Sequence, residues 1–394
     1  MKAVHFGAGS IGRGFIGDLL NDSGYEITFL DVDDGIVNQI NETQSYSLYL
    51  IDHSLEKRVV DKVHAINSAK HENEAVAALR DADIITTSVL GGNLKNIAPV
   101  LQKGLAARLE AHRPRVNILA CENVVGNSKI LRKKILDLSD NELTEEQLDQ
   151  TAAFPDTEVD RLVLKSVRDG KMGIDIGDAY ELVIQRNGLA DPKLQPIRGA
   201  FYTDDIQKYF ERKLYIINTG HAWAGYIGHI YGYTIIQNVF NDPEIMPGIR
   251  GTMQETAALI HAKYGFTMDE LKNYIDFAIN RFMTPGVRDT IVRVSRDPIR
   301  KLQNNERMVG PALQLEERGL DNSLLIRGIA AVLLFDIPED RESVKLKKYI
   351  EDNGIDQAIT HFTGLGSDHP LHDRVLTGYY HLKDIKLYHQ KKKE

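Results

Sequence analysis

The sequence predicts an α/β protein in which an N-terminal Rossmann-type, doubly wound sheet precedes a mainly α-helical C-terminal domain. Short β-rich runs alternate with amphipathic stretches over the first 140 residues, a pattern typical of βαβ units around a parallel sheet. A glycine-rich turn follows the first of these runs, and helical periodicity dominates from about Thr203 onward. Because 394 residues exceed the usual size of one hydrophobic core, we expect two domains, residues 1–195 and residues 196–394.

The predicted elements follow in order along the chain. In the first domain we expect strands at residues 2–6 and 25–32, and helices at residues 10–23 and near residues 34–42. Residues 46–51 and 57–66 predict extra strands or a hairpin, and residues 73–90 and 96–123 each predict a helix that leads into a buried strand. An acidic stretch at residues 138–150 predicts an exposed helix or connection. In the second domain, residues 242–265 and 267–283 have clear helical periodicity.

Composition and charge argue against several classes of function. The net charge of −8 argues against non-specific nucleic-acid binding, and the longest apolar runs, such as Gly328–Phe335, are too short to span a membrane. The single cysteine, Cys121, rules out an internal disulfide and a thiolate zinc site. His369 and His372 lack the further ligands that a metal site needs. We therefore expect a cytoplasmic protein with no metal, no nucleic-acid partner and no membrane contact, also because a strand begins at residue 3 and leaves no room for a leader.

A dinucleotide-binding motif follows the first predicted strand. Gly7, Gly9 and Gly12 form G-x-G-x-x-G at the start of a helix, where the glycines allow a tight turn, close approach of a pyrophosphate and close helix packing. Asp31 ends the second strand, where its carboxylate can accept hydrogen bonds from a ribose 2′-hydroxyl and would repel a 2′-phosphate. The sequence therefore predicts NAD rather than NADP as cofactor. The candidate cofactor-binding residues are Gly7, Ala8, Gly9, Ser10, Ile11, Gly12, Arg13 and Asp31, and Arg13 is either a phosphate ligand or a solvated side chain.

The stretch Lys213–Ala222 places polar groups among apolar neighbours. On an α-helix, Lys213, Asn218 and His221 would lie at roughly 0°, 140° and 80° around the axis, so that all three can line one side of a groove. Gly220 would let a backbone or a ligand come close at that turn. The first interpretation is a set of catalytic groups, with a lysine base desolvated by its apolar neighbours. The second is an amphipathic helix with a solvated lysine, a capping asparagine and a core histidine.

Five stretches taken together resemble the polyol-specific long-chain dehydrogenase/reductase family: "KAVHFGAGSIGRGFIG", "FLDV", "CEN", "ERKLYIINTGH" and "RDPIRKL". The resemblance implies a zinc-independent NAD-dependent dehydrogenase in which Lys213 is the general acid/base and Asn218 holds the reacting oxygen. It also implies that His221 positions substrate and lysine, and that Asn123 is a second partner of the oxygen. The alternative for Asn123 is a strand-end asparagine that caps the next helix.

The resemblance implies the reversible oxidation of D-mannitol 1-phosphate to D-fructose 6-phosphate. A phosphorylated substrate needs local basic groups, and residues 293–307 supply five, of which Arg296, Arg300 and Lys301 are the candidate phosphate ligands. A solvated, salt-bridged helix face is the alternative for this cluster. The sequence departs from the family at Asp160–Ser166, where members often have Asp-Arg-Ile-Val-Pro, and at Leu90, where a glycine is common.

Two other functions stay open at this point. One is the dehydrogenation of a related polyol, polyol phosphate or hexuronate, and the other is a non-catalytic NAD-binding sensor. Whether the protein is a monomer or a dimer is also open.

Overall fold

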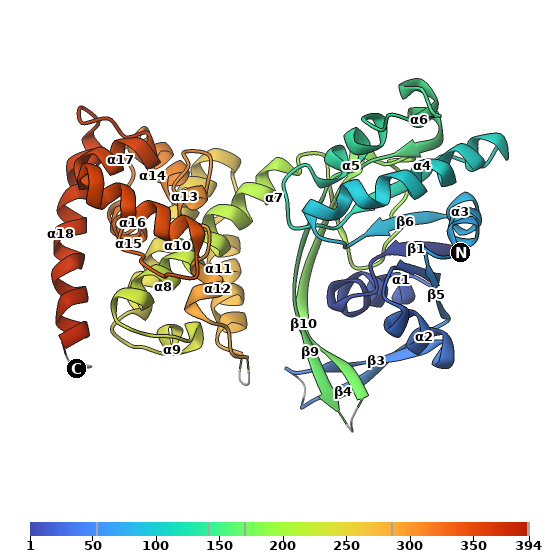
Figure 1. Ribbon diagram of the computed structural model, residues 1–394, viewed down its shortest axis with the longest axis horizontal. Coiled ribbons are helices and arrows are strands. Elements are labelled where there is room, and N and C mark those ends of the chain that lie inside the picture. The colour runs from blue at the N-terminus through green and yellow to red at the C-terminus, as the bar shows by residue number, and fades with distance from the viewer. Residues whose placement is uncertain (53, 141, 169–170, 285–286, 392–394) are drawn as a thin grey trace. The chain divides into compact units, whose positions relative to one another are not determined.

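The computed structural model describes residues 1–52, 54–140, 142–168, 171–284 and 287–391. The chain divides into two compact units, Met1–Tyr209 and Phe210–Glu394. Figure 1 colours the first unit from blue to green and the second from green to red. The boundary predicted between residues 195 and 196 falls inside the first compact unit and stays a proposal.

A six-stranded parallel sheet forms the centre of the first unit (Figure 1). Its strands are β1 Lys2–Phe6, β2 Glu26–Asp31, β5 Val63–Asn67, β6 Ile84–Thr87, β7 Val116–Ala120 and β8 Ala152–Ala153, in the order β5-β2-β1-β6-β7-β8. The strand order reverses between β1 and β6, and ligands of open parallel sheets bind at such a switch point, beyond the carboxyl ends of the strands.

Both faces of this sheet are covered, so β1 is buried beyond Lys2 and β6 is buried along its whole length. Ala3 packs with Phe15 of the first helix on one face, and Val4 packs with residues of the third and fourth helices on the other. The helices of this unit are η1 Gly12–Ile16, α1 Gly17–Asp22, α2 Asp34–Thr43, α3 Glu72–Asp81, α4 Leu94–Glu110, α5 Asn127–Leu136 and α6 Glu145–Thr151, with short turns η2 Gly91–Asn93 and η3 Arg186–Gly188.

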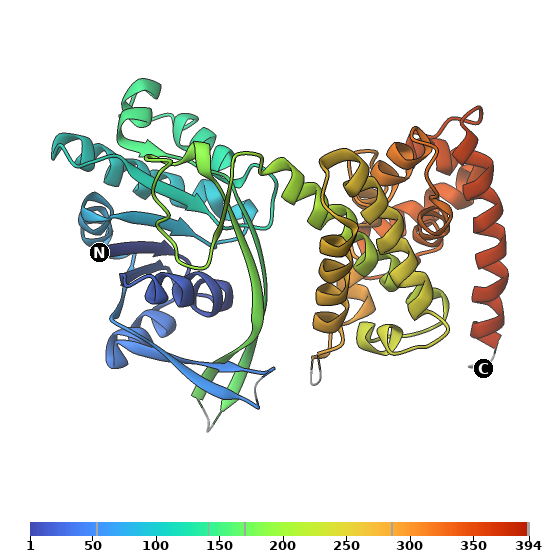
Figure 2. The same ribbon diagram turned by 180° about the vertical axis from the view of Figure 1, so that it is seen from behind.

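A second sheet, in the order β11-β10-β3-β4 with β9 paired to β10, packs on the first helix. Its strands are β3 Ser45–Leu50, β4 Glu56–Asp61, β9 Thr157–Arg168, β10 Lys171–Gln185 and β11 Phe201–Thr203. The antiparallel pair β3–β4 confirms the predicted hairpin. The long β9–β10 hairpin was not predicted, and both views show it, in green, beside the dark-blue helix η1 (Figures 1 and 2).

A buried ion pair joins α1 to the second sheet. Arg161 of β9 donates to Asp18 of α1 at 2.6 Å, and both side chains are almost completely buried. Arg161 also donates to the carbonyl oxygens of Gly14 and Gly177 and lies over the ring of Tyr180. The contact therefore comes from the start of the stretch Asp160–Ser166, at an arginine that this chain shares with the family run, and it lies beneath the helix that follows the glycine turn.

The second unit is helical around one hydrophobic core. Its central helix α8, Thr219–Ile230, is buried along most of its length, including Trp223 and Tyr226. The remaining helices are α9 Ile236–Phe240, α10 Met246–Tyr264, α11 Met268–Phe282, α12 Ile291–Ser295, α13 Pro298–Lys301, α14 Val309–Glu316, α15 Ser323–Val332, α16 Arg341–Asn353, α17 Ile355–Thr363 and α18 Pro370–Lys391. The α/β fold class with a mainly helical second part is confirmed.

Candidate functional site

The glycine motif forms a tight turn between β1 and η1. Gly7 has φ +97°, which side chains other than glycine rarely adopt. A Cβ atom on Gly12 would lie 1.9 Å from the carbonyl oxygen of Gly7, whereas a Cβ atom on Gly9 would have no neighbour within 4 Å. Gly12 is therefore required by packing, and the open space at Gly9 is where a pyrophosphate would need to approach the backbone.

Asp31 is attached to this turn. Its Oδ2 accepts a hydrogen bond of 2.6 Å from the backbone N–H of Ala8, and its Oδ1 accepts from the backbone N–H groups of Val32 and Asp33 at 2.7 and 3.1 Å. These contacts fix the carboxylate at the end of β2. Ser10 is half-buried and Ile11 is exposed in the same loop. The turn and its acidic residue thus fit a dinucleotide with an unmodified ribose.

Arg13 lies in the first turn of η1, and the alternative of a solvated side chain does not hold. The residue is only 5% exposed, and its Nε has no hydrogen-bond partner among the described residues. Burial lowers the pKa of its guanidinium, which the nearby Tyr46 and Asp31 partly offset. The hydroxyl of Tyr46 donates to the backbone carbonyl of Arg13 and holds this turn from the second sheet.

Asn123 is exposed in the loop that follows β7. It does not cap the next helix, because α5 begins at Asn127 after Gly126, with no side-chain cap. The structural asparagine here is Asn127, whose Nδ2 donates to the carbonyl oxygens of Glu122 and Thr157. The N-cap position of α5 is thus held by Gly126 and not by Asn123.

Lys213 to Asn218 form a π-helical turn, η4, between α7 (Gln207–Arg212) and α8. The α-helical angles expected from the sequence are therefore wrong for this stretch. A π-helix bonds residue i to residue i+5, so Lys213 and Asn218 stand about one turn apart, closer to the same face than on an α-helix. Such turns occur frequently at functional sites.

Lys213 is 6% exposed, so the alternative of a solvated lysine does not hold. Its neighbours Tyr215, Ile216 and Ile217 belong to the hydrophobic core of the second unit. The expectation for Gly220 needs correction, because a Cβ atom there would lie 2.5 Å from Cγ of Met253. Gly220 therefore allows a core methionine of α10 to approach α8.

His221 is not a core histidine with both ring nitrogens satisfied. Its ring stacks on Phe282 with the centroids 4.2 Å apart and the planes at 18°, and its Nε2 is buried without a hydrogen-bond partner among the described residues. Burial lowers the pKa of His221 well below its usual value, and the charges of Arg293, Arg281, Lys301 and Arg307 lower it further. His221 is thus a neutral imidazole with an unused polar atom among basic groups.

The three candidate phosphate ligands differ in their surroundings. Lys301 is 3% exposed, and its Nζ donates to the carbonyl oxygens of Val294 at 2.7 Å and Arg296 at 2.6 Å. Burial, followed by the charges of Arg307 and Arg300, lowers the pKa of Lys301 to about 7. An ammonium has three donors, so the protonated lysine keeps one N–H for a ligand.

The two arginines are more exposed and lie near carboxylates. Arg300 pairs with Glu306, which also accepts from Arg307 at 3.0 Å. Arg296 lies 4.0 Å from Asp297. These pairs have the character of the salt-bridged face that was the alternative for this cluster. The side chains of Arg296 and Arg300 are 66% and 45% exposed, whereas those of Glu306 and Arg307 are 18% and 17% exposed.

Sequence reasoning missed two residues that the structure brings to these sites. Arg281, at the end of α11, lies over the rings of Phe277 and Phe282 and is among the charges that act on His221. Glu122, next to Asn123, is buried and accepts hydrogen bonds from Thr87 and from the backbone N–H of Val89. No local pattern identifies either residue, because Arg281 acts on His221 and Glu122 contacts Thr87 and Val89 across segments far apart in the sequence.

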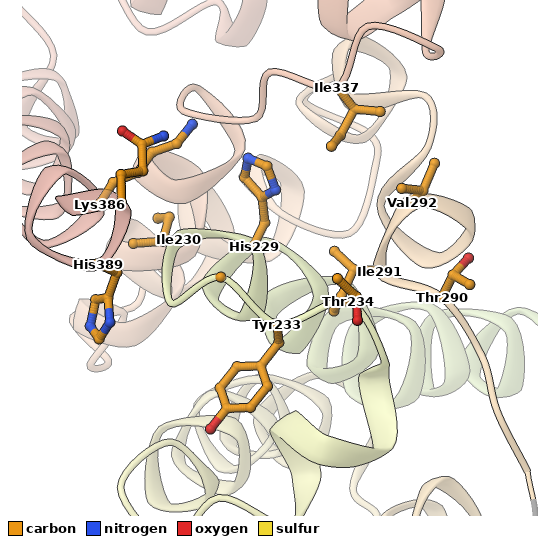
Figure 3. A pocket seen from close by; sticks show the side chains of 12 residues that line it. His229, Ile230, Tyr233, Thr234, Thr290, Ile291, Val292, Ile337, Lys386 and His389 are labelled. Atoms are coloured by element: carbon orange, nitrogen blue, oxygen red, sulfur yellow. The ribbon is translucent and has the colours of Figure 1, made fainter. Parts of the chain in front are cut away.

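A cavity of about 390 Å³ lies in the second unit, at the C-terminal end of α8 (Figure 3). None of the candidate site residues lines it. Its polar residues His229 and Lys386 both contact Asp336, at 2.8 and 2.6 Å, and its wall includes Ile230 and Ile291. His229 and Lys386 thus share Asp336 as their partner, whereas Nε2 of His221 has no hydrogen-bond partner among the described residues.

The described residues contain no group of three or more His, Cys, Asp or Glu side chains arranged to hold a metal ion. Of the helices in this part of the chain, none combines the length and apolar character that crossing a bilayer requires.

Two family models match the chain. The mannitol dehydrogenase Rossmann domain matches residues 1–196, and the mannitol dehydrogenase C-terminal domain matches residues 205–375. Among curated proteins, the chain is 37% identical to a mannitol-1-phosphate 5-dehydrogenase of Geobacillus stearothermophilus, over 97% of this chain and 100% of that protein. It is 38% identical to a protein of the same name from Brevibacillus brevis, over 98% and 99% of the two chains.

Solved structures show the same fold at lower identity. The ternary complex of Pseudomonas fluorescens mannitol 2-dehydrogenase with NAD and D-mannitol is 17% identical, with a TM-score of 0.75 over 100% of this chain and 95% of that one. A substrate-free D-sorbitol dehydrogenase is 18% identical, with a TM-score of 0.81 over 98% and 94%.

The family models and the full-length relatives confirm the resemblance inferred from the sequence, and with it the predictions of an oxidoreductase and of a Rossmann domain for NAD. The chain belongs to the mannitol dehydrogenase family.

Proposed function

We propose that this protein interconverts D-mannitol 1-phosphate and D-fructose 6-phosphate with NAD, without a metal ion. The observation that carries the proposal is the identity of 37% to a mannitol-1-phosphate 5-dehydrogenase over 97% of this chain. The basic groups around His221 support a phosphorylated substrate, because an acidic protein can hold a dianion only where cationic side chains are concentrated.

In this proposal Gly7, Gly9, Gly12 and Asp31 would hold NAD, which would supply the hydride acceptor for the oxidation of a secondary alcohol. Lys213 takes the hydroxyl proton on Nζ, which requires the amine to be neutral, and its burial favours the neutral form. In the reverse direction the same ammonium returns a proton to the carbonyl oxygen.

Neutral amide and imidazole groups hold the reacting oxygen. Asn218 stands about one π-helical turn from Lys213 and would donate to the oxygen as negative charge develops. Asn123 would donate to the same oxygen. The buried, unpartnered Nε2 of His221 would bind a substrate hydroxyl, because a polar atom left unsatisfied in the core costs free energy unless a ligand satisfies it.

The phosphate would be held by Lys301, with Arg296 and Arg300 as weaker candidates. Lys301 keeps one donor after its two carbonyl contacts, and it acts on His221 electrostatically. Arg296 and Arg300 would have to exchange or share their present carboxylate partners.

Steady-state kinetics with a panel of polyols tests the substrate. Mannitol 1-phosphate should reduce NAD⁺ with a higher kcat/KM than mannitol, other hexitols, their phosphates or hexuronates. Faster turnover of an unphosphorylated polyol or a hexuronate would overturn the phosphate assignment and favour the related dehydrogenases.

Lys213→Ala tests the mechanism and separates an enzyme from an NAD sensor. The variant should lose roughly 10²–10⁴-fold in kcat and should bind NADH as tightly as the unmodified protein. Lys347→Ala, which removes an exposed lysine of α16, is the matched control and should be fully active. Undiminished turnover in Lys213→Ala would remove the proposed base.

A further inference from the structure

Leu90, in the loop after β6, has an unusual backbone conformation. Its φ is +74° and its ψ is 141°, a combination that only glycine adopts readily. The two following residues are glycines, yet neither has a positive φ. The chain thus holds a bulky residue in a strained conformation directly before residues that could have adopted it without strain.

Hydrogen bonds on both sides hold this loop in place. The backbone N–H of Val89 donates to Oε1 of the buried Glu122 at 2.9 Å. On the other side, Nδ2 of Asn93 donates to the carbonyl oxygen of Val89 at 2.8 Å and the backbone N–H of Asn93 donates to that of Leu90 at 2.9 Å. Strain of this kind persists only where the surroundings determine the conformation, and such strain is concentrated at functional sites.

The loop lies against the dinucleotide turn. A Cβ atom on Gly7 would be 2.9 Å from the carbonyl oxygen of Ser88 and 3.3 Å from Cγ1 of Val89, and one on Gly91 would be 3.5 Å from Cγ1 of Val124. Because β1 pairs with β6 and β6 with β7, Leu90 lies beyond the switch point of the sheet, between the glycine turn and the loop of Asn123.

Exposed apolar side chains gather at this edge of the sheet. Leu90 is 75% exposed, and other large hydrophobic residues that are exposed in the loops after β1, β2 and β7 are Ile11, Val32, Val124 and Val125. A dinucleotide that extends from the glycine turn across the carboxyl ends of β6 and β7 would cover Leu90 and Val124.

We propose that Leu90 is a cofactor-contacting residue whose strained backbone directs its side chain against the bound dinucleotide, on the nicotinamide side of the glycine turn. This inference rests on the proposed use of NAD, but not on the identity of the polyol. It assigns to Leu90 a contact that a glycine at the same position cannot make. The strain reduces the stability of the free protein, and the side chain contributes to cofactor affinity.

Two substitutions separate the side chain from the strain. Leu90→Ala removes the apolar contact but keeps a Cβ atom, so NADH should bind about three- to tenfold more weakly with little change in thermal stability. Leu90→Gly should weaken NADH binding to the same extent and raise Tm above that of Leu90→Ala by about 2–4 °C. Val167→Ala, at a 70% exposed valine of β9, is the control and should leave NADH affinity unchanged.

The measurements are NADH fluorescence titration and differential scanning calorimetry of the full chain. Unchanged NADH affinity in both Leu90 variants overturns the contact. If the affinity is unchanged and only the oligomeric state of the variants differs, the contact is likewise overturned, and this edge of the sheet would instead bind a protein partner. A Leu90→Gly variant no more stable than Leu90→Ala overturns the strain. These results do not depend on mannitol 1-phosphate turnover, so a failed substrate assignment is recognised separately. If the unmodified protein bound no NADH, both the proposed use of NAD and the proposed contact of Leu90 would be overturned.

Discussion

The backbone N–H of Ala8 donates a hydrogen bond of 2.6 Å to Oδ2 of Asp31. The glycine turn after β1 and the acidic residue at the end of β2 are therefore parts of one structure before any nucleotide binds. The carboxylate that would recognise a ribose also holds the loop that would receive the pyrophosphate. Substitution of Asp31 should consequently affect both stability and cofactor choice.

The substitution Asp31→Ala should remove both the hydrogen bonds that hold the glycine turn and the carboxylate that would recognise the ribose. Three backbone N–H groups lose their acceptor, so we expect the free energy of unfolding to fall by about 1–3 kcal/mol. The ratio of kcat/KM for NAD⁺ to that for NADP⁺ should fall at least about tenfold, because the carboxylate no longer repels a 2′-phosphate. Asp33→Ala removes the cap of α2 and should cost about 1 kcal/mol without changing the ratio. An unchanged ratio in Asp31→Ala would mean that another residue selects the cofactor.

Alanine substitutions at Gly12 and Gly9 should affect different properties, namely stability at Gly12 and NADH affinity at Gly9. A Cβ on Gly12 collides with the backbone of Gly7, so Gly12→Ala should unfold at a clearly lower temperature or fail to fold. Gly9→Ala meets no neighbour and should change the free energy of unfolding by less than about 1 kcal/mol. Its NADH affinity should nevertheless fall, because the methyl group occupies the space of the pyrophosphate. Calorimetry and NADH titration check the pair, and full NADH affinity in Gly9→Ala would contradict this position for the phosphates.

His221→Phe tests whether the imidazole acts on substrate or only fills the core. Phenylalanine preserves the stacking on Phe282 and removes the unpartnered Nε2, so stability at neutral pH should stay the same or rise by about 1 kcal/mol. KM for the sugar phosphate should rise and kcat/KM should fall by about 10²-fold or more. Full activity in a stable His221→Phe protein would leave the histidine with a packing role only.

Burial of His221 should also make the free energy of unfolding depend on pH in the acidic range. Burial, then the neighbouring cationic side chains, lower the pKa of His221 in the folded protein, so the unfolded chain binds the extra proton first. Stability should therefore fall as the pH drops below about 6.5, the usual histidine pKa. Urea unfolding at pH 5.5 and pH 7.5 should show a smaller difference for His221→Phe than for the unmodified protein. Equal differences would locate the acid sensitivity elsewhere.

The lowered pKa of Lys301 should make substrate affinity depend on pH. Burial lowers its pKa to about 7, so the ammonium is present below this pH and is lost above it. If Lys301 binds the phosphate, KM for mannitol 1-phosphate should rise as the pH increases through about 7. Lys301→Met should remove this step and keep the higher KM at every pH, while NADH affinity stays unchanged. Because the substrate phosphate titrates near pH 6, the comparison with Lys301→Met identifies the lysine, and an identical pH profile in the variant would exclude it.

The ion pair of Asp18 and Arg161 should be strongly coupled. Arg161→Met leaves the buried carboxylate of Asp18 with Arg58 as its remaining cationic partner among the described residues, so the free energy of unfolding should fall by about 3–5 kcal/mol. The double variant Arg161→Met with Asp18→Leu removes both charges and should recover much of this loss. Urea unfolding of the single and double variants measures the coupling energy, and additive losses would show that the two residues do not act as a pair.

The sequence alone determined the features that depend on local order along the chain. The α/β fold class, the β3–β4 hairpin and the glycine turn follow from periodicity, and Gly7 and Gly12 have the conformation and packing that the motif requires. The family resemblance also rests on short motifs, of which the stretch from Glu211 to His221 is the most specific. Each of these motifs is short, so the residues that define it lie close together in the sequence.

Only the tertiary structure decided the environment of each group. Burial made Lys213 a core residue and left Nε2 of His221 without a partner, and a π-helical turn changed the angular positions computed for an α-helix. Arg161 pairs with Asp18, 143 positions away in the chain, and the β9–β10 hairpin that carries it was not predicted. Local patterns specify which side chains a helix or strand presents. The dielectric surroundings, pKa values and partners of those side chains depend on segments that come together only when the chain folds.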